Sequence, residues 1–134
     1  MIKTDNERFE TEIFHHFNEV KGSDDTLTIY KSVLAESIFL KEFDCEPGYR
    51  SPTSHLDFRF LLRKDNSQNC FAIKIRNKRL TFYFRAPIIS FYDKKELLKA
   101  LPELQESNGE YFIVLKDLKT WQQVLHYIKC YKGK

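Results

Sequence analysis

The residues of this chain that are best suited to chemistry are cations that alternate with apolar side chains between residues 55 and 85. Side chains along a strand point to opposite faces with a period of two, so this alternation predicts one apolar face and one basic face. Lysine and arginine neutralise phosphates, and the cluster therefore predicts binding to a polyanion. The predicted basic face has one acid, Asp57, one aromatic residue, Tyr83, and the cations Arg59, Arg63, Lys74, Arg76, Lys78, Arg79 and Arg85.

The same alternation predicts the elements that position these cations. Strands are expected over 55–63, 70–78 and 79–85, joined by a polar turn at 64–69 and a tight turn around residues 77 and 78. Such short connections make the three strands antiparallel neighbours. Their shared buried side is predicted to hold Phe58, Phe60, Leu62, Phe71, Ile73, Ile75, Leu80, Phe82 and Phe84.

Helical spacing of apolar residues predicts two helices before these strands. The first covers 7–20, and the second begins near residue 25 and runs to about residue 43. The segment 44–54 contains two prolines and a glycine, so we expect a surface loop there. Its residues Tyr49 and Arg50 lie between the two prolines, which limit the entropy lost on docking, so this loop is a candidate for partner binding.

After the strands, the pattern predicts a short edge strand over 88–92, a helix over 93–102, a strand over 110–115 and a final helix from residue 117. The predicted order is ααβββαβα. The fold class expected from this order is α+β, with a mostly antiparallel sheet of four or five strands and helices packed on one face. We expect a single domain over 1–134, with a helical part over 1–43 and the sheet and its helices over 55–134.

Composition narrows the class of protein. The chain has 134 residues, of which 42% are hydrophobic and twelve are phenylalanine, enough for one packed core. It contains no run of about 18 apolar residues and no apolar segment near residue 1, so we expect a cytoplasmic protein without a membrane partner. The net charge of +3 is mild, and the distribution of charge must therefore identify any nucleic-acid site.

Motifs for catalysis and cofactors are missing from the sequence. The three cysteines, Cys45, Cys70 and Cys130, lack the spacing of a zinc site. No glycine-rich phosphate loop and no nucleophile motif occurs. We therefore expect a non-enzymatic protein with no cofactor and no metal.

The hairpin over residues 56–76 nevertheless resembles the D…(E/D)xK hairpin of PD-(D/E)xK nucleases. In that family two acids hold a divalent metal and a lysine orients or activates the attacking water. Asp57 matches the first acid, but the second acid falls on Lys74 and the lysine on Arg76, or in another register on Ala72 and Lys74. A further departure is the predicted strand 79–85, where the family usually places a helix.

Two interpretations of Asp57 remain open at this point. The resemblance implies a nuclease-like domain that kept an acid-binding surface and lost cleavage, with any residual metal site at Asp57. Glu36 on the preceding helix supplies a second carboxylate only if that helix lies over the same strand end. Otherwise Asp57 is an ion-pair partner for Arg59 or Lys74.

Three functions follow from these patterns, in order of preference. The first is a non-enzymatic nucleic-acid-binding module that uses the basic sheet face and the loop with Tyr49 and Arg50. The second is a protein-interaction or inhibitor domain whose basic face covers an acidic partner or a nucleic-acid channel. The third is a metal-dependent nuclease-like domain.

Overall fold

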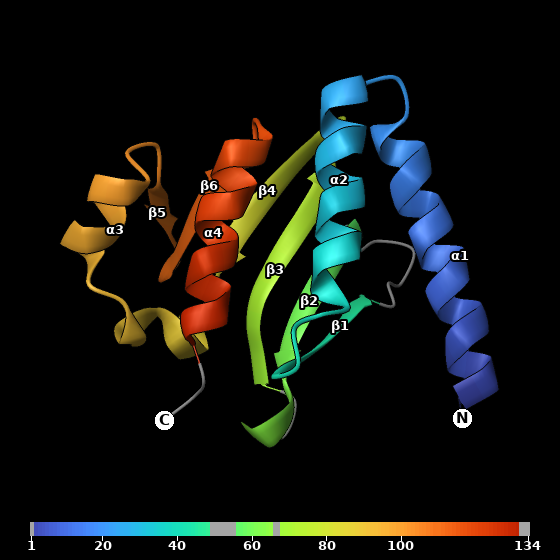
Figure 1. Cartoon of the computed structure of the whole chain (residues 1–134), viewed down its shortest axis with the longest axis horizontal. Helices are drawn as coiled ribbons and strands as arrows, with labels where there is room; N and C mark the ends of the chain where they lie inside the picture. The colour runs from blue at the N-terminus through green and yellow to red at the C-terminus, as the bar shows by residue number, and fades with distance from the viewer. Residues whose placement is uncertain (1, 49–55, 66–67, 132–134) are drawn as a thin grey trace.

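The computed structural model of this chain describes residues 2–48, 56–65 and 68–131. Two helices come first in the chain, a run of strands follows, and the final part contains both helices and strands (Figure 1). In chain order they are α1 (Ile2–Val20), α2 (Asp24–Ser37), β1 (Phe43–Pro47), β2 (Leu56–Leu62), the 3-10 helix η1 (Arg63–Asp65), β3 (Gln68–Arg76), β4 (Arg79–Phe84), the 3-10 helix η2 (Ala86–Phe91), α3 (Lys94–Ala100), β5 (Gln105–Ser107), β6 (Glu110–Val114) and α4 (Leu118–Cys130).

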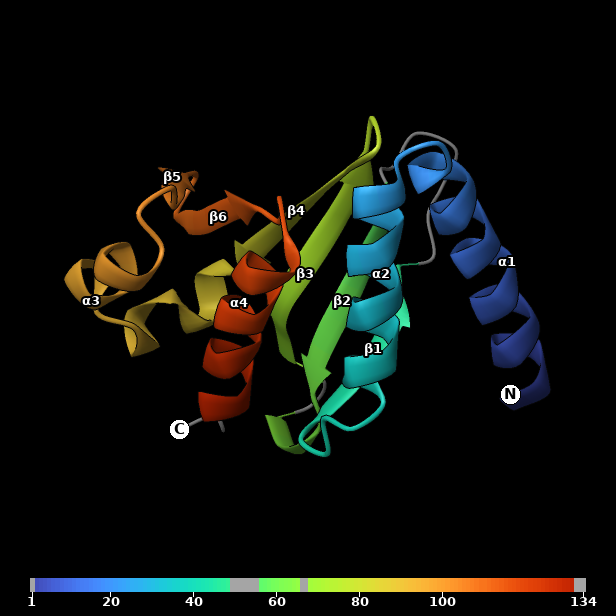
Figure 2. The ribbon, with the colours of Figure 1, turned by 45° about the horizontal axis from the view of Figure 1, so that its top comes forward.

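The strands form one antiparallel sheet in the order β1-β2-β3-β4-β6-β5. Helices α2 and α4 lie side by side across one face of this sheet, and α1 lies beside α2 near the β1 end (Figures 1 and 2). The predicted α+β class with helices on one face is confirmed. The sheet has six strands in the described residues, whereas four or five were predicted.

The core lies between the helices and the apolar face of the sheet. All of the apolar residues predicted for that face are at most 2% exposed, which confirms the alternation over β2, β3 and β4. Their rings pack mostly edge to face, while Phe71 and Phe82 stack with ring centroids 5.7 Å apart. Trp121 on α4 and Tyr30 on α2 close this core from the helix side, and both are fully buried.

The predicted loop over 44–54 is wrong at its beginning, because Phe43–Pro47 form the edge strand β1. Phe43 pairs with Leu62 and Pro47 with Phe58, so both point into the core. Proline suits this place because an edge strand leaves the amides of one side without a ladder partner. Helix α2 ends at Ser37, before the predicted limit, and the candidate residues Tyr49 and Arg50 lie outside the described residues.

The predicted edge strand over 88–92 is also wrong, because most of this segment belongs to the 3-10 helix η2. Pro87 stands in its first turn, where the fixed φ of proline suits a helical start and its missing amide donor would have weakened a ladder. Among the described residues, no helix combines the length and the apolar character needed to cross a membrane.

Candidate functional site

The face of the sheet opposite α2 and α4 is the open face, since no described helix lies behind it (Figures 1 and 2). Strand register places its side chains in rows that cross the sheet. One row holds Glu46, Arg59, Ala72, Tyr83 and Phe112, and the next holds Asp57, Lys74, Thr81 and Val114. The predicted basic face therefore exists, but β1 and β6 add acids and an aromatic residue to it.

Three of the predicted cations are already neutralised by carboxylates. The acids involved come from β1, β2 and β6, and each accepts a hydrogen bond from an arginine Nε. The pairs are Arg59 with Asp57 (3.2 Å), Arg63 with Asp44 (2.7 Å) and Arg85 with Glu110 (2.6 Å). This part of the open face consequently carries little net charge.

The remaining cations of the open face, Lys74, Arg76 and Arg79, are exposed and form no ion pair with any residue in the described ranges. Lys74 precedes Arg76 by two residues on β3, so both point to the same side, and Arg76 is the cross-strand partner of Arg79. With Asn77, Thr81 and Tyr83 they line a hollow of about 330 Å³, called the cationic hollow below. Tertiary structure therefore concentrates the unpaired charge at one end of the face.

The pairing of Arg76 with Arg79 is unfavourable for the free protein. Like charges that stand directly opposite each other on antiparallel strands destabilise the pair of strands. Neither guanidinium has a carboxylate within salt-bridge distance among the described residues. This end of the open face therefore carries positive charge that no described carboxylate neutralises.

Lys78 does not belong to the open face, so this part of the prediction is wrong. It occupies the turn between β3 and β4 with φ 58°, and Asn77 before it has φ 55°. Its Cε lies 3.3 Å from the point where a Cβ on Gly22 would stand, so the side chain lies against the α1–α2 turn. The alternation of strand side chains ends where the backbone enters the left-handed region, and the simple period of two therefore misplaced this residue.

Arg63 also lies outside the ladder. It follows the last residue of β2 and begins η1, and its ion pair with Asp44 links the end of β2 to β1. The strand predicted over 55–63 thus ends one residue early, at Leu62.

Tyr83 is held in a stack across three strands. Phe112 on β6 stacks on its ring with centroids 5.4 Å apart and planes 26° apart, and Lys74 Nζ on β3 lies 4.7 Å from its centroid. Because β3 and β6 flank β4 on opposite sides, the two neighbours cover opposite faces of the ring. Burial, and secondarily the charge of Glu110, raises the pKa of Tyr83, so the phenol stays neutral. A base therefore has no free face of Tyr83 on which to stack.

Asp57 sits where the nuclease resemblance places its first acid, directly opposite Lys74. Its Oδ2 accepts from Arg59, which confirms the ion-pair interpretation. Gly48 on the neighbouring strand end donates its amide to the Asp57 carbonyl, and a Cβ at Gly48 would collide with Asp57 Oδ1. Within the described residues, no group of three or more His, Cys, Asp or Glu side chains is arranged to hold a metal ion. Strand β4 follows β3 directly, as predicted.

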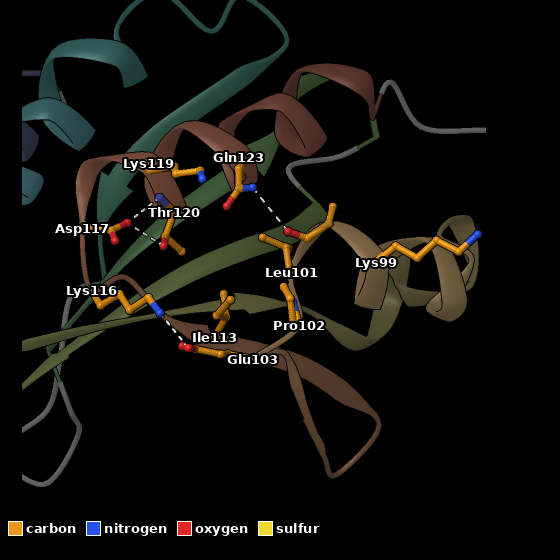
Figure 3. Close-up of a pocket in the computed structure, with 11 residues that line it drawn as sticks. Lys99, Leu101, Pro102, Glu103, Ile113, Lys116, Asp117, Lys119, Thr120 and Gln123 are labelled. Atoms are coloured by element: carbon orange, nitrogen blue, oxygen red, sulfur yellow. Dashed lines mark hydrogen bonds and ion pairs between the residues drawn. The ribbon is translucent and has the colours of Figure 1, made fainter.

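A second pocket, of about 360 Å³, lies between the end of α3 and the start of α4 (Figure 3). Its polar groups mostly bond one another: Lys116 to Glu103 at 2.6 Å, and Thr120 to Asp117 through both its amide and its hydroxyl. These two bonds from Thr120 lower the pKa of Asp117, which caps α4. The sequence patterns did not predict this pocket. Gln123 Nε2 on α4 donates to the Ala100 carbonyl at the end of α3 at 3.3 Å, so one bond of the lining joins these two helices.

Comparison of the chain with protein-family models, with curated proteins and with solved structures finds no match. What the open face binds is therefore inferred from its own charges and contacts.

Proposed function

We propose that the protein binds nucleic acid without catalysis, by placing backbone phosphates against Lys74, Arg76 and Arg79 on the open face. The observation that supports this proposal is the gathering of these three cations around one hollow, with no carboxylate partner among the described residues. Phosphate neutralisation by such side chains dominates the affinity of most nucleic-acid-binding proteins.

The other predicted cations take a smaller part in this proposal. The bonds of Arg59 and Arg85 to carboxylates use Nε, and a guanidinium carries five N–H donors in all. Neither residue lines the cationic hollow, but the remaining N–H groups of each are able to donate to a further phosphate of a bound strand while the ion pair persists. Their net contribution is small because the carboxylate repels the phosphate.

The stack around Tyr83 indicates which kind of recognition to expect. Both faces of this ring are covered, so the tyrosine supports the position of Lys74 rather than offering a platform for a base. Contacts to phosphates carry no information about sequence. We therefore propose binding that depends strongly on salt and weakly on nucleotide sequence.

Cleavage is not part of this proposal. Lys74 stands opposite Asp57, where the nuclease pattern needs a second carboxylate, and Arg76 and Arg79 lie nearby. Positive charges at these points repel Mg²⁺, whereas they attract phosphate.

The decisive experiment measures the affinity of a labelled single-stranded oligonucleotide by fluorescence anisotropy at several NaCl concentrations. We expect log Kobs to fall against log salt, with a slope of about −0.7 for each phosphate that the cations neutralise on a single strand. The combined variant Lys74→Glu, Arg76→Glu, Arg79→Glu is expected to lose binding and salt dependence together.

A matched control reverses the charge of three exposed lysines on helices, Lys31, Lys95 and Lys129, and changes the net charge by the same amount. This control should retain nearly all of the affinity. Equal losses in both triple variants, or an affinity that does not respond to salt, would contradict the proposal. Retention of a protein partner after nuclease treatment would favour the acidic protein surface instead.

A further inference from the structure

The cationic hollow has two arginines that face each other across the last pair of strand positions before a turn. Arg76 and Arg79 flank Asn77 and Lys78, and partners in such a hydrogen-bonded position have Cα atoms about 5.5 Å apart. Lys74 lies one side-chain repeat away on β3, at a distance of about 6.7 Å along the strand. Three positive side chains therefore line one hollow of about 330 Å³.

The backbone that carries the two arginines is anchored from the helix side. The carboxylate of Glu19 on α1 accepts the amide of Asn77 at 2.7 Å, and the hydroxyl of Thr26 on α2 donates to the carbonyl of Lys78 at 2.9 Å. These bonds fix both residues of the turn. These contacts with α1 and α2 hold together the hairpin end that carries the two arginines.

Three carboxylates on the surrounding elements are already engaged. Asp57 accepts from Arg59, Glu110 accepts from both Arg85 and the Ala86 amide, and Glu19 accepts from the Asn77 amide. If one of these acids paired with Arg76 or Arg79 instead, the hydrogen bond that it accepts at present would be lost.

We propose that the cationic hollow is a subsite for a single phosphate group, and that occupation of this subsite stabilises the folded protein. The inference deepens the function proposed above and rests on it for the carrier of the phosphate, a nucleic-acid strand. Two guanidiniums suit this ligand because each presents paired N–H donors that match phosphate oxygens. Thr81 and Asn77 in the lining add a hydroxyl and an amide, and the volume also admits the sugar attached to the phosphate.

Occupation has a measurable consequence for stability. Repulsion between Arg76 and Arg79 is present in the free protein and is offset when an anion lies between them. A ligand that binds only the folded state stabilises it in proportion to the logarithm of its concentration over Kd. A phosphate compound at ten times its Kd is therefore expected to raise Tm by about 5 °C in a chain of this size.

The test is thermal unfolding of the full chain in NaCl, in inorganic pyrophosphate and in a short single-stranded oligonucleotide, all at equal ionic strength. The variants are Arg79→Gln, which removes one side of the subsite, and Lys31→Gln, an exposed charge on α2 as the control. Pyrophosphate should raise Tm for the unsubstituted chain and the control, but not for Arg79→Gln. In NaCl alone, Arg79→Gln should unfold at the same temperature as the unsubstituted chain or above it.

Absence of the pyrophosphate effect, or an equal effect in Arg79→Gln, overturns the subsite. If the oligonucleotide still binds through the three cations in that case, the proposed function stands and the subsite alone fails. If pyrophosphate stabilises the protein as expected but the oligonucleotide does not bind, the subsite stands and its phosphate comes from a free phosphate compound.

Discussion

The two faces of the sheet follow the same alternation but are organised by different requirements. On β4, Leu80, Phe82 and Phe84 are fully buried under the helices, while Arg79, Thr81 and Tyr83 point to the open face. On the covered face one requirement, exclusion of water, applies to every side chain. On the open face each charge depends on its own neighbours, so Arg59 and Arg85 are paired, while Arg76 and Arg79 have no acidic partner among the described residues. Burial is therefore a collective property of a face, whereas available charge is a local one.

The largest expected effect is unfolding at alkaline pH, caused by ionisation of residues buried on the covered side of the sheet. Burial raises the pKa of Tyr30 and of Tyr92 above the ordinary value for tyrosine, and burial raises the pKa of the Cys45 thiol to about 12. The unfolded chain loses these protons more readily than the folded one. The stability that they contribute is thus fully present below the unfolded pKa values, about 8.5 for cysteine and 10 for tyrosine, and is lost as pH rises beyond them.

Circular dichroism and tyrosinate absorbance measured along one alkaline titration test this prediction. Ionisation of the buried phenols should coincide with loss of secondary structure. Full ionisation of all tyrosines in a chain that keeps its secondary structure would contradict the burial of Tyr30 beside His16, whose Nδ1 lies 2.7 Å from the Tyr30 hydroxyl.

A pair of substitutions on adjacent residues of β4 compares the two faces directly. Phe82→Ala should lower the free energy of unfolding by about 3–5 kcal/mol because it opens a cavity among packed rings. Tyr83→Ala should lower it by about 1 kcal/mol, mainly through loss of the stack with Phe112. Urea denaturation of both variants gives the two values. Similar losses would show that the open face is packed as tightly as the covered one.

At the hairpin end, Lys78→Gly should raise the free energy of unfolding by about 1 kcal/mol. Lys78 holds a positive φ that a side chain disfavours, and glycine is the usual residue at this position of such a turn. Oligonucleotide affinity should change little, because the Lys78 side chain lies against Gly22 and away from the cationic hollow. The matched variant Asn77→Gly should gain less, since asparagine tolerates this conformation. A large loss of affinity in Lys78→Gly would show that the Lys78 side chain takes part in binding.

The smallest expected effect concerns the unpaired end of the open face. Arg79→Glu converts the like-charged pair with Arg76 into an opposite-charged one and should raise the free energy of unfolding by about 0.2–1 kcal/mol. Oligonucleotide affinity should fall in the same variant, so stability and binding move in opposite directions. Lys31→Glu on α2 is the charge-matched control for both measurements. A loss of stability in Arg79→Glu would show that the arginine supports the fold rather than a ligand.

Parts of the fold that repeat a strong pattern were predictable. Strands β2, β3 and β4 and helix α4 each place apolar residues at the spacing of their own element, and all of them were predicted near their observed positions. Strand β1 was missed because Pro47 signals a loop unless the strand is known to lie at an edge. Strand β5 was missed because its three residues are all exposed and show no alternation.

The candidate site was also predictable only in part. Spacing alone placed Arg59, Lys74, Arg76 and Arg79 on one face, and the structure agrees. Spacing could not identify the partners Asp44 and Glu110, which are distant in sequence from the arginines that they neutralise. Phe112 was missed for the same reason, since its place beside Tyr83 depends on β6 pairing with β4.

By itself the sequence determined the class of fold and the polarity of its sheet, because side-chain alternation and helical spacing are properties of a local segment. Tertiary structure alone decided which of the cations remain without a carboxylate and which aromatic rings are covered. Those outcomes depend on strand order and on the α1–α2 turn that holds Asn77 and Lys78, contacts that join residues far apart along the chain. Electrostatic interactions act through space over a few ångströms, so only the folded arrangement shows where positive charge is left for a ligand.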